Sequence, residues 1–128
     1  MRRTISTIGK TITVGALAAG GLVAGGGAAH ADGFPGGPWC NTDIVLKAES
    51  QLSQVVVCTQ PGDTRYQYQG KAKTNGNYVT IPNAAYASGG YHAHNNGYAY
   101  HARPDGLEIL GPDGAVVSFE PWISFVTY

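Results

Sequence analysis

From residue 43 to its end, the chain consists of short segments separated by glycine, proline and asparagine, in most of which apolar or aromatic residues alternate with polar ones. A period of two places successive side chains on opposite faces of a β-strand. Residues 43–49 (DIVLKAE) and 65–73 (RYQYQGKAK) show this alternation, and residues 54–59 (QVVVCT) form a continuous apolar run that fits a central strand. The pattern predicts an all-β domain.

Turn-forming motifs favour an antiparallel arrangement. Asn96-Gly97 is a strong two-residue hairpin turn, since both central positions need positive φ, and Pro104-Asp105-Gly106 and Pro112-Asp113-Gly114 suit type I turns. The remaining expected strands are residues 77–82 (ended by Pro82), 90–95, 98–103, 106–110, 115–120 and 122–126. We predict a small antiparallel sandwich or partly open barrel of about seven to eight short strands.

Residues 43–55 allow a second interpretation. Ile44, Ala48, Leu52 and Val55 also match the spacing of one face of a helix. The sequence therefore leaves a strand or a helix open for this segment.

The first 31 residues predict a secretory signal peptide. Arg2, Arg3 and Lys10 form a basic region, an uncharged apolar run follows, and Ala29-His30-Ala31 matches the A-x-A cleavage pattern. We expect cleavage after Ala31 and a protein that is secreted, either extracellular or held in the cell envelope. The residues around the arginine pair favour general secretion over twin-arginine export without deciding between them.

Cleavage would leave a flexible Gly/Pro-rich arm at residues 32–39 and a single β domain at residues 40–128. This part of the chain has five basic and eight acidic residues, a net charge of −3. It lacks the basic footprint of a nucleic-acid-binding domain and the basic patch that adheres to anionic lipid. We expect an unknown protein or a cell-envelope component as partner, no nucleic acid, and no integral membrane segment after processing.

Cys40 and Cys58 are the only cysteines. Because an exported chain meets an oxidising environment, we expect them to form a disulfide, and the short loop it closes corresponds to roughly 3 kcal/mol of stabilisation. Trp39 is expected to pack over this bond. The wide spacing of the two cysteines fits neither a redox pair nor a thiolate metal site.

The segment GGYHAHNNGYAYHAR, residues 89–103, holds three of the four histidines. With Asn96 and Gly97 at the centre of the turn, His92 is directly opposite His101 and His94 is opposite Ala99. One face of the hairpin then carries the three histidines and Arg103. The other face carries Tyr91, Ala93, Tyr98, Tyr100 and Ala102, and we expect it to face the core.

Three imidazoles on one sheet face are a candidate Zn²⁺ or Cu²⁺ site formed by His92, His94 and His101. The hairpin supplies no carboxylate of its own, so Asp63 or Glu108 would have to lie nearby. Haem binding through Tyr or His is a further alternative. The plainest interpretation is a solvated outer face with no cofactor, on which clustered histidines resist full protonation and the hairpin loosens below about pH 6.

No catalytic residues can be assigned, because the chain has no G-x-S-x-G, S-x-x-K, H-E-x-x-H or phosphate-loop motif. Glu120-Pro121-Trp122 could line a groove for a sugar or peptide, although such a tryptophan more often closes one end of a sandwich. The leading hypothesis is a secreted, non-enzymatic, all-β binding or interaction domain of unknown ligand. The alternative is an extracellular transition-metal or haem binder that uses the histidine hairpin.

The order of the motifs resembles a known group of proteins. Cys40 and Cys58 are followed by Tyr66-Gln67-Tyr68-Gln69-Gly70, Ile81-Pro82, Gly90-Tyr91, Asn96-Gly97, Tyr98-Ala99-Tyr100, Pro104-Asp105-Gly106-Leu107-Glu108-Ile109, Gly114 and Glu120-Pro121. This series is similar to small exported actinobacterial, mostly mycobacterial, proteins with one disulfide and a β-rich domain. The resemblance covers nearly the whole chain after the signal peptide. It implies a secreted or envelope-associated β domain, and it carries no functional residue over to this chain.

Overall fold

The computed structural model describes residues 32–62 and 64–128, and the predicted signal peptide lies outside these residues. The described part contains eight strands. They are β1 (Ile44–Ser50), β2 (Ser53–Thr59), β3 (Tyr66–Ala72), β4 (Tyr78–Ala87), β5 (Gly90–Asn95), β6 (Tyr98–Arg103), β7 (Gly106–Leu110) and β8 (Val116–Thr127). The described residues contain no helix that is long and apolar enough to cross a membrane.

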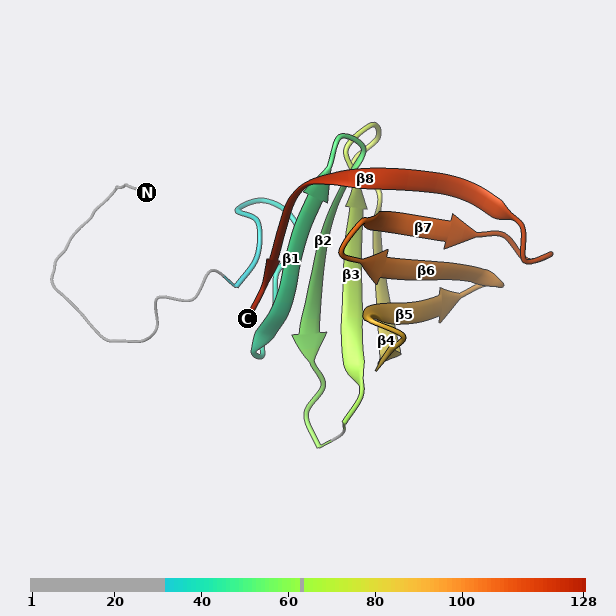
Figure 1. Cartoon of the computed structure of the whole chain (residues 1–128). Helices are drawn as coiled ribbons and strands as arrows, with labels where there is room; N and C mark the ends of the chain where they lie inside the picture. Colours follow the sequence, from blue (N-terminus) through green and yellow to red (C-terminus); the bar gives the residue numbers. More distant parts are fainter. Residues whose placement is uncertain (1–31, 63) are drawn as a thin grey trace, which may run out of the picture. The chain divides into compact units, whose positions relative to one another are not determined.

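The strands form a closed antiparallel barrel in which each strand pairs with its neighbours in sequence and β8 pairs with β1 (Figure 1). The predicted all-β class and strand number are confirmed, and the barrel is closed rather than partly open. The helical alternative for residues 43–55 is wrong. In these residues the inward side chains of β1 alternate with outward ones, and Val55 pairs with Ala48 across the hairpin.

Two long strands, β4 and β8, each turn a corner between two sheets (Figure 1). β4 pairs with β3 up to Ala84 and with β5 from Ala85 onward. β8 pairs with β7 up to Pro121 and with β1 from Trp122 onward. We call β1–β3 with the adjoining parts of β4 and β8 the first sheet, and β5–β7 with the remaining parts the second sheet.

Prolines at these corners explain two wrong predictions. Pro82 does not end β4, which continues to Ala87, and residues 115–120 and 122–126 are not two strands but one. At each corner the register shifts next to a proline, and Asn83 adopts a φ of 64°. A proline lacks the N–H of a regular ladder, so it is tolerated where a strand changes partners.

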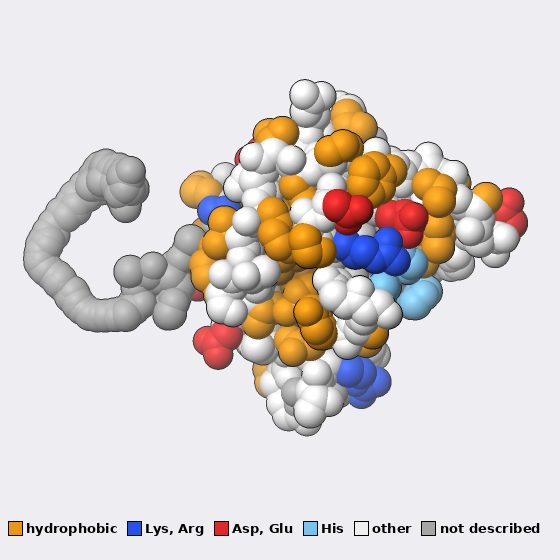
Figure 2. All heavy atoms as spheres, viewed as in Figure 1, with side chains coloured by type: hydrophobic (Ala, Val, Ile, Leu, Met, Phe, Trp, Pro, Cys, Tyr) orange, Lys and Arg blue, Asp and Glu red, His pale blue; other side chains and the backbone are white. Residues whose placement is uncertain are grey.

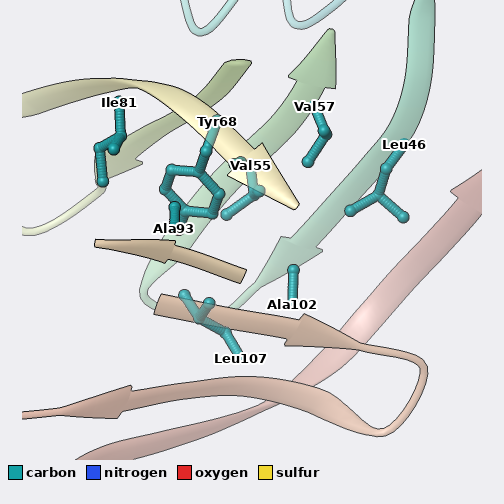
Figure 3. Packing of buried hydrophobic residues seen from close by; sticks show 9 residues of the cluster. Leu46, Val55, Val57, Tyr68, Ile81, Ala93, Ala102 and Leu107 are labelled. Carbon is teal, nitrogen blue, oxygen red and sulfur yellow. The ribbon is translucent and has the colours of Figure 1, made fainter. Parts of the chain in front are cut away.

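The barrel interior is filled mainly by large side chains of the first sheet, which meet two alanines and one leucine of the second (Figure 3). The first sheet contributes Leu46, Val55, Val57, Tyr68 and Ile81, and the second contributes Ala93, Ala102 and Leu107. Alternation of large and small residues is the usual way in which a narrow barrel is packed.

Residues 32–40 pack against the outer face of the first sheet. Backbone hydrogen bonds join Phe34 to Pro38 and Cys40 to Asp32. Phe34 is buried in a cluster with Ile44, Val56 and the Cys40–Cys58 disulfide, whose sulfur atoms are 2.01 Å apart. The predicted disulfide is confirmed, but Phe34 covers it, while Trp39 is 43% exposed. Within the run QVVVCT the four apolar residues 55–58 are all buried, because both faces of β2 are covered.

Candidate functional site

The histidine hairpin has the predicted register. His92 is paired with His101, His94 with Ala99 and Ala93 with Tyr100. Asn96 and Gly97 both have positive φ, 53° and 82°, as a two-residue turn of this kind requires.

The inner face of the hairpin faces the core as expected. Ala93 and Ala102 are buried, and Tyr91 and Tyr100 are half-buried against the core cluster. Tyr98, next to the turn, is 40% exposed and is not part of the core cluster.

On the outer face the structure brings together a histidine pair and an ion pair. The rings of His92 and His101 lie edge to face with their centroids 4.4 Å apart. His101 Nδ1 is 3.1 Å from Glu108 Oε1, which also accepts a hydrogen bond of 3.0 Å from Arg103. His92 Nε2 lies 2.7 Å from the carbonyl oxygen of Ala87 and must carry a proton to donate to it. Figure 2 shows histidine, basic and acidic side chains gathered on this face.

The three predicted metal ligands are not all part of this arrangement. His94 is exposed and takes no part in the contacts between His92 and His101. Within residues 32–62 and 64–128, no group of three or more His, Cys, Asp or Glu side chains could hold a metal ion. Glu108 does lie beside His101, and Asp63 is outside the described residues. The Zn²⁺, Cu²⁺ or haem site therefore stays a prediction, and the observed geometry does not favour it.

The surroundings of His101 favour its neutral form. Burial lowers the pKa of His101 below its ordinary value, and the nearby charges of His92 and Arg103 act in the same direction, against the opposing hydrogen bond to Glu108. Glu108 has a lowered pKa because His101 and Arg103 donate hydrogen bonds to it. This cluster is a charge-sensitive surface of the second sheet rather than a cleft.

One end of the barrel, where β4 leads into β5 and β6 into β7, contains a pocket of about 510 Å³. Among the described residues its lining includes five aromatic side chains and no charged side chain. The residues are Val45, Tyr66, Tyr86, Gly89, Gly90, Tyr91, Ala102, Pro104, Phe125, Thr127 and Tyr128. We call this site the tyrosine pocket.

The tyrosine rings in this pocket hold one another in fixed orientations. Tyr91 lies between Tyr66 and Tyr86, with ring centroids 5.0 Å from each and edge-to-face geometry. Burial raises the pKa of Tyr91, so its hydroxyl stays protonated well above neutral pH. Tyr86 and Tyr128 are each 58% exposed at the rim. The pocket thus offers apolar ring faces together with hydroxyl groups that can donate and accept hydrogen bonds.

The opposite end, where β1 leads into β2 and β3 into β4, contains a second cavity of about 340 Å³. Glu120 of β8, Tyr68 and Gly70 of β3, Tyr100 of β6 and Ile109 of β7 are among the residues that line it. Because Glu120 is only 7% exposed, we call this site the carboxylate cavity.

The segment Glu120-Pro121-Trp122, which is a candidate groove lining in the sequence, both lines cavities and contributes to packing. Glu120 lines the carboxylate cavity, and with Pro121 and Trp122 it also lines a third recess of about 280 Å³. The Trp122 indole N–H donates a hydrogen bond to the carbonyl oxygen of Arg103, and the ring packs against the core. The tryptophan therefore ties the two sheets together at a corner. No local sequence pattern predicts the tyrosine pocket, because its residues come from six strands and from segments next to them.

The fold and these recesses define a small closed antiparallel β-barrel with a hollow at each end. Comparison with protein-family models, with curated proteins and with solved structures found no match for this chain. The structure itself is therefore the basis for any statement about function.

Proposed function

We propose that this protein is an exported, non-enzymatic binding domain that takes up an uncharged ligand in the tyrosine pocket. The single observation that carries the proposal is the lining of that pocket, in which four tyrosines and one phenylalanine surround about 510 Å³ and none of the described lining residues has a charged side chain. Ligand sites are typically concave and largely apolar or aromatic, with a few polar groups for orientation.

The character of the lining indicates the class of ligand. A charged ligand would lose its hydration without gaining a countercharge in this pocket, so a neutral ligand is favoured. Such a ligand would stack a flat apolar face on the tyrosine rings and exchange hydrogen bonds with their hydroxyl groups. Sugars offer both features, and neutral oligosaccharides are the first class to test.

The predicted signal peptide and the disulfide support export, since disulfides persist in oxidising compartments. The relation to small exported actinobacterial proteins, which rests on the series of turn and core motifs, is part of the same proposal.

The proposal does not include catalysis. In the described residues the hydroxyl of Ser50 accepts hydrogen bonds from the N–H groups of Leu52 and Ser53, so it caps a turn.

The test is a titration of the wild-type protein with neutral di- and trisaccharides, followed by NMR of the tyrosine ring signals. We expect the shifts to concentrate on Tyr66, Tyr86 and Tyr91. Tyr86→Ala removes an exposed wall of the pocket and should weaken binding at least about tenfold, within the range for loss of a stacking aromatic side chain. Tyr98→Ala is the matched control, because Tyr98 is similarly exposed and lines neither end cavity. Equal weakening by both variants, or shifts confined to other surfaces, would contradict the proposal.

A further inference from the structure

The carboxylate cavity at the other end of the barrel has no role in the function proposed above. Glu120 is on β8 between two exposed neighbours, so the alternation of the strand turns its side chain inward. It lies more than nine-tenths buried and lines the cavity. Burial of a carboxylate is costly unless hydrogen bonds or a cation compensate for the lost water.

The compensation that the protein itself supplies is only partial. The hydroxyl of Ser50 donates a hydrogen bond of 2.7 Å to Glu120 Oε1, and the hydroxyl of Ser118 is 3.4 Å from Oε2. The ion pairs recorded among residues 32–62 and 64–128 involve Glu49 and Glu108, and none includes Glu120. The Glu120 carboxylate is therefore next to two neutral hydroxyl groups, and no cationic side chain of the described residues forms an ion pair with it.

The basic residue on the lining of the carboxylate cavity does not supply this charge. Among the described lining residues Lys71 alone is basic, and it belongs to the outward-facing positions of β3. Its ammonium group lies 3.3 Å from the carbonyl oxygen of Gly36 and 5.5 Å from the centre of the Tyr78 ring. The Lys71 ammonium group therefore contacts Gly36 and Tyr78 and is not paired with Glu120.

The rings of Tyr68 and Tyr100 line the same cavity as the Glu120 carboxylate. The ring of Tyr68 leans over Gly70, where an added Cβ would lie 3.1 Å from Cε1 and 3.2 Å from the hydroxyl oxygen. Gly70 therefore leaves the room in which Tyr68 extends toward the end that contains Glu120. The ring of Tyr100 lies 5.5 Å from that of Tyr68. Burial, then the nearby Tyr100 and Glu120, raise the pKa of Tyr68, so its hydroxyl stays neutral.

From this combination we infer that the carboxylate cavity binds a small organic ammonium ion. A buried carboxylate without a countercharge attracts a cation, and the half-buried ring of Tyr100, backed by the buried ring of Tyr68, stabilises an ammonium group through cation–π contact. Ile109 and Val79, which are half-buried, line the same cavity and would receive an apolar tail. A volume of about 340 Å³ corresponds to roughly ten water molecules, so the ligand has on the order of ten non-hydrogen atoms.

Three probes of one shape and different charge test this assignment. They are n-hexylammonium, 1-hexanol and hexanoate, titrated into the wild-type protein at pH 7 and followed by NMR of the Tyr68 and Tyr100 rings and the Glu120 carboxyl carbon. We expect hexylammonium to bind at least about tenfold more tightly than hexanol, the ratio that ~1.4 kcal/mol supplies. Hexanoate should bind more weakly than hexanol. Equal binding of the three probes would overturn the inference.

The variant Glu120→Gln keeps the size of the side chain and an oxygen for Ser50 but removes the charge. It should reduce the preference for hexylammonium over hexanol to near unity. Asp43→Asn is the matched control, because it removes one negative charge from an exposed position at the opposite end of β1 and should leave the preference unchanged. A preference that survives in Glu120→Gln would overturn the inference.

If Glu120→Gln does not fold, the preference of the wild-type protein for hexylammonium over hexanol and hexanoate still tests the inference. A second variant, Tyr100→Leu, removes one ring face and should lower the affinity for hexylammonium more than the affinity for hexanol.

The result for the carboxylate cavity is independent of the result for the tyrosine pocket. Sugars should shift the signals of Tyr86 and Tyr91, whereas ammonium should shift those of Tyr68 and Tyr100, and either result can fail alone.

Discussion

The two sheets of the barrel are built differently, although they have similar numbers of strands. The first sheet is covered on both faces, by the core inside and by residues 32–40 with the disulfide outside. The second sheet contributes small side chains such as Ala93 and Ala102 to the core and carries a polar cluster around His101 on its outer face. The difference indicates that the first sheet holds most of the apolar packing, while the second sheet meets solvent with groups that can change charge.

The largest expected effect is a truncation in the first sheet. Leu46 is fully buried, so Leu46→Ala should lower the free energy of unfolding by about 2–5 kcal/mol, through lost burial and the cavity left behind. Denaturant unfolding would measure it. The exposed Leu52→Ala is the control and should cost less than about 0.5 kcal/mol. A loss below about 1 kcal/mol for Leu46→Ala would mean that the first sheet is not the main packed element.

The disulfide should matter next. It closes a short loop, since Cys40 and Cys58 have a sequence separation of 18, so replacing both by alanine should cost about 3 kcal/mol. Because the bond joins residues 32–40 to β2, hydrogen exchange should quicken in β1 and β2 before it quickens in β5–β7. Uniform quickening in both sheets would show instead that the barrel opens as a single unit.

The alternation of residues predicted the strands well but not the way the barrel closes. The Asn96-Gly97 turn fixed the histidine register, because a two-residue hairpin leaves one pairing for every residue around it. Pro82 and Pro121 misled the prediction, since a proline usually ends a strand, and here each lies where a strand bends from one sheet to the next. Phe34 was missed because DGFPGGPW has the composition of a loose segment, and only the tertiary contact with Val56 gives it a place.

The two end cavities could not be predicted from the sequence, because each is lined by residues from several strands. Glu120 could be noticed beside Pro121 and Trp122, but nothing local shows that it lies near Tyr68 and Tyr100, which come from other strands. The tyrosine pocket likewise joins Tyr66 to Tyr91 and Phe125. The pattern of a strand tells which side chains face inward, whereas the stagger of the closed barrel decides which of them meet.

The third prediction tests whether the small residues of the second sheet are needed. Ala93 is buried in the core cluster with the large side chains of the first sheet, so Ala93→Leu should overpack the interior and cost about 1–3 kcal/mol. Thermal unfolding would measure the loss. Ala115→Leu, at an exposed loop position, should leave stability nearly unchanged. An Ala93→Leu variant as stable as the wild type would mean that the interior has spare room on the side of the second sheet.

The smallest expected effect is the pH response of the outer face of the second sheet. Burial lowers the pKa of His101 in the folded state below 6.5, its ordinary value, which we take for the unfolded chain. The unfolded chain therefore takes up a proton first as the pH falls. The contribution of His101 to stability is fully present above pH 6.5 and is lost below it, as the pH approaches the lower folded pKa. Glu108, with its pKa lowered from 4.5, adds a loss only at still lower pH.

Denaturant unfolding at pH 8 and at pH 5.5 would measure this response. His101→Gln should unfold with a smaller difference between the two pH values than the wild type, because the titrating group is gone. His94→Gln is the control, since His94 is exposed and lies outside the contacts of His101, so it should keep the wild-type difference. If His94→Gln removed the response and His101→Gln did not, the charge-sensitive element would be the end of the hairpin. The pH response of the second sheet would then rest on the exposed His94 near the Asn96-Gly97 turn, and not on the contacts among His101, Arg103 and Glu108.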